Sequence, residues 1–231
     1  MPHTILITGA GRGLGLALAH VLTHEGHTVI GTIRDPKQAE ALKTLGAEVE
    51  TLDVADEKSI EALGAKLANA GPAGVARPID ILVNNAGVSS RQNKLTELTQ
   101  AELRRAFDVN AFAPLLVAKA LWPSLRAGER KVVMNITSQL GSIANNTGGS
   151  SYPYRGSKAA LNQLTRSMAA ELRGQCTCFV VHPGWVRTDM GGPGAPIEPQ
   201  ESAAALAKLL AKAGPPVSGK FLNYDGTELP W

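Results

Sequence analysis

The segment HTILITGAGRGLG, residues 3–15, joins a short apolar run to a cluster of four glycines. The apolar run, 3–9, predicts a buried strand. The segment 14–26 that follows has the apolar spacing of a helix and ends at a glycine. Between a strand and a helix, glycines allow a tight turn and close approach to the backbone, and the helix N-terminus favours an anion. The stretch therefore predicts a phosphate-binding loop at residues 8–15; a glycine turn without a ligand is the alternative.

The same alternation of strand and helix continues along the chain. Strands are expected at 3–9, 27–34, 47–54, 79–87, 131–138, 176–184 and 219–226, and helices at 14–26, 35–46, 56–71, 98–126, 154–173 and 201–213. Pro114 should kink or interrupt the longest helix. Strands that are apolar throughout indicate a parallel sheet covered on both faces. We therefore expect one α/β domain over 1–231, a Rossmann-type doubly wound sheet of seven strands.

Composition excludes several classes of function. The 231 residues are 44% hydrophobic and 19% charged, and the net charge is +3 without a long cationic run. Nucleic acid and membrane partners are therefore not expected. No apolar run approaches the roughly 18 residues of a spanning helix, and the apolar segment at Thr4 leaves no room for a leader, so a cytoplasmic protein is expected. Cys176 and Cys178 are expected to be buried thiols rather than redox or metal groups.

The end of the second strand bears on the choice of nucleotide. Ligands of an open parallel sheet bind beyond the carboxyl ends of its strands. An acid at this point would bind the ribose 2′-hydroxyl of NAD, but the sequence has Ile33 followed by Arg34. Arg34 and Arg12 can pair with a 2′-phosphate. NADP(H) is therefore expected, with NAD(H) as the alternative. Arg34 as a solvated loop cation, or one offset by Asp35, is the competing interpretation.

Other strand ends carry polar groups as well. Asp53 can accept from an adenine amino group or simply precede a helix. The turn NNAG, 84–87, suits a ribose, and Ser138 places a hydroxyl at the cleft. The sixth strand runs into HPGWVRTDM, 182–190. Glycine and proline then dominate the segment to residue 200, which indicates a mobile substrate lid at about 188–200.

One tyrosine has a lysine one helical turn away. Tyr154 and Lys158 are four residues apart, whereas neither Tyr152 nor Tyr224 has a cation at that spacing. A free phenol has a pKa near 10, and a nearby ammonium lowers it toward neutrality. General acid–base catalysis works best with a pKa near the working pH. The pair is therefore the candidate proton-transfer group, and a surface pair without function is the alternative.

These motifs together resemble the short-chain dehydrogenase/reductase family along essentially the whole chain. The matching pieces are TGAGRGLG, NNAG, Asn110, Ser138, Tyr154 with Lys158, and PGWVRT. The resemblance implies that Ser138 polarises a substrate carbonyl, that Tyr154 transfers the proton, that Lys158 lowers the phenol pKa and binds the nicotinamide ribose, and that Asn110 kinks its helix and holds a water. The implied cofactor contacts are Gly9, Arg12, Gly13, Leu14, Gly15, Arg34, Asp53, Val54, Asn84, Ala86, Gly87, Tyr154, Lys158, Pro183, Gly184, Val186 and Thr188; Val186 and Thr188 would contact the carboxamide.

Three segments resemble one branch of that family. Ser138 and Tyr154 are 16 positions apart, and GSIANN (141–146), YRGSKAALN (154–162) and YDGTELPW (224–231) are similar to the C-factor and sniffer carbonyl reductases. The resemblance implies NADPH-dependent reduction of a small ketone or aldehyde, or the reverse, by a homodimer or homotetramer. A cofactor-binding signalling protein with weak catalysis is the alternative. A hydrolase is disfavoured because no G-x-S-x-G motif is present.

Overall fold

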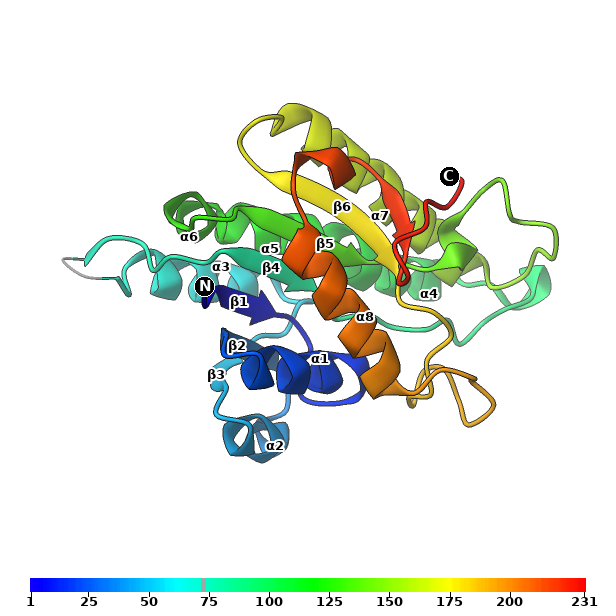
Figure 1. Cartoon of the computed structure of the whole chain (residues 1–231). Helices are drawn as coiled ribbons and strands as arrows, with labels where there is room; N and C mark the ends of the chain where they lie inside the picture. The colour runs from blue at the N-terminus through cyan, green and yellow to red at the C-terminus, as the bar shows by residue number, and fades with distance from the viewer. Residues whose placement is uncertain (72–73) are drawn as a thin grey trace.

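Seven parallel strands form one sheet in the computed structural model, which describes residues 1–71 and 74–231 (Figure 1). The strands are β1 (Thr4–Ile7), β2 (Thr28–Ile33), β3 (Glu48–Thr51), β4 (Ile81–Asn84), β5 (Val132–Ile136), β6 (Thr177–His182) and β7 (Phe221–Asn223). Their spatial order is β3-β2-β1-β4-β5-β6-β7. The order reverses between β1 and β4, the point at which doubly wound sheets bind ligands. The predicted fold class is confirmed.

Helices cover both faces of the sheet, and alternate strand residues point to each face. In β1, Ile5 and Ile7 belong to the core beneath α1 (Gly13–His24) and α8 (Pro199–Lys212), whereas Leu6 belongs to the core on the other side (Figure 1). The remaining helices are α2 (Ala39–Thr44), α3 (Glu57–Ala68), α4 (Gln100–Phe107), α5 (Ala113–Ala120), α6 (Trp122–Ala127) and α7 (Tyr152–Glu171). None of the helices in the described part of the chain is long and apolar enough to cross a membrane.

The long helix expected at 98–126, with a kink or interruption at Pro114, consists of three helices. A π-helical turn, Asp108–Phe112, separates α4 from α5, and the chain breaks again at Leu121 between α5 and α6. Pro114 and Pro123 each occupy the first turn of the helix that follows the break. A proline has no N–H to donate to the preceding turn, so the regular bonding pattern changes just before it. The break at Pro123 was absent from the prediction.

The helix that carries Tyr154 begins at Tyr152, two residues earlier than predicted. Pro153 lies in its first turn, where a missing N–H costs nothing. Ser150 and Ser151 precede it with positive φ angles of 56° and 48°. These left-handed residues turn the chain sharply into the helix.

A chain of buried side chains joins the centre of the sheet to two helices. Asn84 Nδ2 donates to Asn135 Oδ1 at 2.8 Å and to the carbonyl of Pro114 at 3.2 Å. Asn135 Nδ2 donates to Thr165 Oγ1 at 2.7 Å. The Asn84 side-chain amide therefore lies in the core and is bonded there, and the expected cofactor contact at Asn84 stays a prediction.

The two cysteines are buried, as predicted. Cys176 is 7% exposed and Cys178 is fully buried. Their Sγ atoms are 3.6 Å apart, and the Cys178 thiol donates to Cys176. They lie on the same side of β6, as residues two apart on a strand must.

Replacing Asn135 with alanine should lower the free energy of unfolding by about 2 to 4 kcal/mol, because it leaves a cavity and removes partners from two buried groups. Urea unfolding measures the change. Asn69 is exposed, and its side chain donates to the carbonyl of Ala65 in its own helix; N69A is the matched control and should stay within about 0.5 kcal/mol of the parent. Equal stability of N135A and the parent would contradict this account of the core.

Candidate active site

The glycine-rich loop adopts a shape that side chains would prevent. Gly9 and Gly13 have φ angles of +65° and +54°, the left-handed region that favours glycine. A Cβ on Gly9 would lie 3.0 Å from Cα of Ala86 in the turn after β4. α1 begins at Gly13, and the side chain of Arg12 makes no capping hydrogen bond. The first amides of the helix therefore have no side-chain cap at the carboxyl ends of the strands. These amides and the helix dipole form a cradle for a phosphate.

Thr8 and Asn85 hold the loop against the neighbouring strand end. Thr8 Oγ1 accepts from the main-chain N–H groups of Asn85 and Ala86 at 3.0 and 3.1 Å. Asn85 Nδ2 donates to the carbonyls of Thr8 and Gly9 at 2.9 and 3.1 Å. The sequence prediction omitted both residues, although their motifs were recognised. A polar residue at the end of each apolar strand is the signal that identifies them.

The predicted reactive side chains lie close together at the carboxyl ends of the strands. Ser138 follows β5 and is 7% exposed, and Tyr154 stands in the first turn of α7 with its ring partly exposed. Lys158 Nζ lies 5.9 Å from the centre of the Tyr154 ring. Nζ donates to the carbonyl of Ile136 at 2.8 Å, so the lysine is tied to β5.

The electrostatics of this pair differ from the prediction. Burial raises the pKa of the Tyr154 phenol, and hydrogen bonding with Ser138 lowers it by less. The Lys158 ammonium lies over the ring and is bonded to the carbonyl of Ile136. Burial also lowers the pKa of Lys158 to about 8. The phenol therefore holds its proton at neutral pH, and the lysine is close to its own titration range.

Asn110 lies in the π-helical turn and is fully buried. Its Oδ1 accepts from Val88 N at 2.8 Å, and its Nδ2 donates to Val88 O and to Ser157 Oγ at 2.9 and 3.0 Å. Asn110 thus joins the turn after β4 to α7. A Cβ on Gly87 would lie 3.2 Å from Asn110 Oδ1 and 3.7 Å from Lys158 Nζ, which places these two polar groups on one side of the same glycine.

Arg34 and Arg12 differ in whether the guanidinium already has a partner. Arg34 is exposed after β2, and Asp35 accepts from Lys37 N at 3.0 Å as the cap of the next turn. Arg12 is exposed but its guanidinium pairs with Asp189 in the lid. Sequence alone did not indicate this partner, because 177 positions separate the two residues.

Asp53 and the remaining predicted contacts lie at the same edge of the sheet. Asp53 Oδ1 accepts from Ala55 N at 3.0 Å, while Asp56 caps α3, so Asp53 is not the helix cap. Leu14 and Gly15 lie in the first turn of α1. The others lie in the turns after β3, β4 and β6: Val54, Ala86, Gly87, Pro183 and Gly184.

The lid and the turn that precedes it make several internal contacts. Val186 pairs with Ile197 in an isolated bridge, and Trp185 Nε1 donates to Gly191 O at 2.8 Å. Thr188 Oγ1 accepts from Gly191 N at 3.2 Å, and a Cβ on Gly13 would lie 3.3 Å from the Thr188 methyl group. Val186 and Thr188 therefore lie on a segment that closes against the glycine loop.

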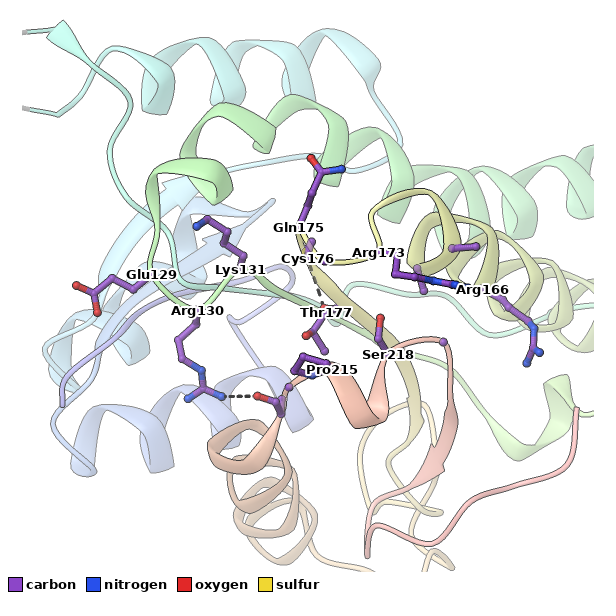
Figure 2. Close-up of a pocket in the computed structure, with 16 residues that line it drawn as sticks. Glu129, Arg130, Lys131, Arg166, Arg173, Gln175, Cys176, Thr177, Pro215 and Ser218 are labelled. Carbon is purple, nitrogen blue, oxygen red and sulfur yellow. Dashed lines mark hydrogen bonds between the residues drawn. The ribbon is translucent and has the colours of Figure 1, made fainter.

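A cavity of about 790 Å³ lies at the amino ends of the strands, opposite the candidate site (Figure 2). Its walls include Lys131 and Cys176, which precede β5 and β6, and Arg173 beyond the end of α7. Arg130, also in the wall, donates to the carbonyls of Leu210 and Ala213 at the end of α8. The reactive groups all lie at the carboxyl ends of the strands, so this cavity is separate from the candidate site.

Comparisons with known proteins identify the family to which the chain is similar. A family model described as short chain dehydrogenase matches residues 3–196. The C-signal protein of Myxococcus xanthus is 44% identical over 155 residues, which is 67% of this chain and 93% of that protein. The carbonyl reductase Sniffer of D. melanogaster superposes with a TM-score of 0.91 at 33% identity, covering 100% of both chains. A carbonyl reductase from Pseudomonas aeruginosa in complex with NADP superposes with a TM-score of 0.83 at 33% identity, again over 100% of both chains.

Replacing Lys158 with methionine should raise the free energy of unfolding at pH 7 by about 1 to 3 kcal/mol, because burial of the ammonium is costly. The gain in stability is smaller than the free energy equivalent to the whole pKa shift, because the carbonyl of Ile136 loses its hydrogen-bond donor. Below the folded pKa of about 8 both states carry the proton and the penalty is complete. The penalty disappears as the pH rises from about 8 toward 10.5, the ordinary pKa of lysine, because the folded state loses its proton before the unfolded state does.

Urea unfolding of K158M and the parent at pH 7 and pH 9.5 tests this. The difference should shrink at the higher pH. K208M, at an exposed position on α8, is the control and should change stability by less than about 0.5 kcal/mol. A difference that is independent of pH would show that packing, rather than the buried charge, sets the effect.

Proposed function

The chain belongs to the short-chain dehydrogenase family, an oxidoreductase family that uses nicotinamide cofactors, and we propose that it reduces the carbonyl of a small ketone or aldehyde with NADPH or catalyses the reverse reaction. The observation that carries the proposal is the convergence of Ser138, Tyr154, Lys158 and Asn110 at one edge of the sheet. The glycine loop lies at the same edge, after β1.

The residues present fit a dinucleotide. The uncapped start of α1 and the positive φ of Gly9 and Gly13 provide a cradle for the pyrophosphate. Lys158 Nζ and the turn at Gly87 would hold the nicotinamide ribose. Arg34, with Arg12 beside the loop, would bind a 2′-phosphate. When bound, the nicotinamide supplies or takes up the hydride.

Tyr154 is the proton donor in the direction of reduction. Burial keeps its phenol protonated at neutral pH, which is the state a donor needs. The Ser138 side chain is close enough to the phenol to lower its pKa, so a substrate oxygen beside both groups would meet two hydroxyl donors. Lys158, with a pKa of about 8, is mostly protonated at pH 7 and stabilises the phenolate left after transfer.

Asn110 holds this arrangement in place. Its amide joins the turn at Val88 to Ser157, and Ser157 in turn donates to the carbonyl of Tyr154 at 2.9 Å. The bonds restrain the first turn of α7, where the phenol is mounted. The water that the family resemblance assigns to Asn110 would stand near Lys158.

A signalling or regulatory role with weak catalysis is the second candidate. The likeness to the C-signal protein, 44% over 155 residues, favours it. A protein that only binds the cofactor has no need of the Tyr154 phenol, whereas this chain holds it beside Ser138 and Lys158. We therefore rank turnover above binding alone.

Replacing Tyr154 with phenylalanine should reduce NADPH-linked carbonyl reduction by about 10²- to 10⁴-fold, because the proton donor is lost. A panel of ketones and aldehydes, followed by absorbance of reduced nicotinamide, measures the rate. Y152F is the matched control and should retain most activity, since Tyr152 has no lysine one turn later. NADPH affinity should be similar in both variants. Unchanged rates in Y154F would refute the mechanism.

Replacing Arg34 with alanine should weaken NADPH binding by about five- to tenfold, the loss of one charge-assisted contact at an exposed position. NADH binding should hardly change, because NADH has no 2′-phosphate. Fluorescence titration gives both dissociation constants. K37A removes an exposed cation from the same loop and should have little effect. Equal weakening of NADPH and NADH in R34A would remove Arg34 from the phosphate site.

A further inference from the structure

Two of the segments that resemble the sniffer branch, 141–146 and 224–231, contact each other, although at least 78 positions separate them in the sequence. Ala144 N donates to the main-chain oxygen of Trp231 at 2.9 Å, and Ser142 Oγ donates to the same oxygen at 3.3 Å. Figure 1 shows the segment after β7, in red, beside the green loop that leads into α7. Neither contact belongs to the catalytic or cofactor machinery described above.

The Trp231 side chain is anchored from two sides. Its ring packs against Phe221 of β7, with centroids 5.6 Å apart. The guanidinium of Arg166 on α7 lies 5.2 Å from the ring centre, within the range of a cation–π contact. The indole joins an apolar cluster made of Leu161, Val180, Phe221, Leu229 and Trp231. Trp231 therefore presents its oxygen at a defined place above the end of the sheet.

The main chain leading to Trp231 is also fixed. After β7 the chain reverses at Gly226, which has a φ of +90°, and returns antiparallel along the strand. Asn223 N donates to Thr227 O, and Leu229 N donates to Phe221 O, both at 2.8 Å. The position of Trp231 thus follows from the register of β7.

The loop at 139–151 links the two hydroxyl groups of the proposed reaction, since it follows Ser138 and ends just before α7. At its start, Gly141 O accepts from Asn162 Nδ2 at 3.3 Å. At its end, Ser151 N donates to Asn93 O at 2.8 Å. Between these points, the bonds to Trp231 hold Ser142 and Ala144, and Ile143 between them is 79% exposed.

We propose that Trp231 is a positioning residue for the substrate site, which holds residues 142–147 as a fixed wall beside the bound carbonyl compound. The proposal rests on the proposed carbonyl reduction for its kinetic part, but not for its structural part. The loop starts and ends at the reacting hydroxyls, so its path sets the space next to them. Without the indole anchor, that wall loosens and productive binding of the substrate weakens, while the chemistry at Tyr154 persists.

Hydrogen exchange of the free protein tests the structural part. In W231A the Ala144 amide and its neighbours should exchange about tenfold faster, the loss of roughly one net hydrogen bond and its anchor. Amides of β5 should not change. W231F keeps an aromatic ring and should restore most of the protection. W122A, which removes a partly buried tryptophan from the opposite core, is the matched control. Unchanged exchange at 142–147 in W231A would overturn the proposal.

Steady-state kinetics test the substrate part. In W231A the KM for carbonyl substrates should rise about three- to tenfold, with kcat within about twofold and NADPH affinity unchanged. W122A should leave KM at the parent value. If W231A loosens the loop but leaves KM unchanged for every accepted carbonyl compound, the loop is not a substrate wall and the proposal is overturned.

Ser142 allows the same test if W231A does not fold. S142A removes one donor to the Trp231 oxygen and should raise exchange and KM in the same direction, by a smaller factor. A parent protein that reduces no carbonyl compound would refute the proposed function, whereas the exchange result would still decide whether Trp231 holds the loop.

Discussion

The buried ammonium of Lys158 is the constraint on which the reactive end of the molecule depends. Only 5% of the residue is exposed, and its nitrogen is bonded to the carbonyl of Ile136 at the end of β5. A charge in such a place must be held by fixed polar groups or it loses its proton. The position of Lys158 therefore depends on α7 keeping a fixed position relative to β5, and contacts elsewhere in the structure hold the helix there.

Several contacts along α7 hold the helix in this position. Asn110 bonds Ser157, Thr137 donates to Asn162 at 2.6 Å, and Asn135 donates to Thr165. Each bond joins one turn of the helix to a strand end or to the broken helix before it. A Cβ on Gly141 would lie 2.9 Å from the main chain of Lys158, so the loop after Ser138 can approach the helix only through a glycine. The phenol, the serine hydroxyl and the ammonium are thus held by one helix with bonds on several turns.

The fold could be predicted from the alternation of apolar strands and helices, because that pattern depends on local periodicity and burial. The pairing of Tyr154 with Lys158 could be predicted for the same reason, since four residues make one helical turn. Features that depend on the tertiary environment were missed or predicted wrongly. The Asn84 amide turned into the core, the phenol pKa rose, and Arg12 met Asp189 from the lid. Each outcome depends on groups that are distant in sequence, so a local sequence pattern could not predict it.

The antiparallel return of the chain along β7 has a consequence for self-association. Residues 227–229 occupy the main-chain groups on the outer side of β7, where another molecule could otherwise add a strand. At the other edge of the sheet, the edge strand β3 carries Glu48 and Glu50. Glu48 pairs with Arg77, and Glu50 pairs with Lys66. Charged side chains on an edge strand discourage strand addition. Both edges of the sheet therefore disfavour the addition of a strand from another molecule.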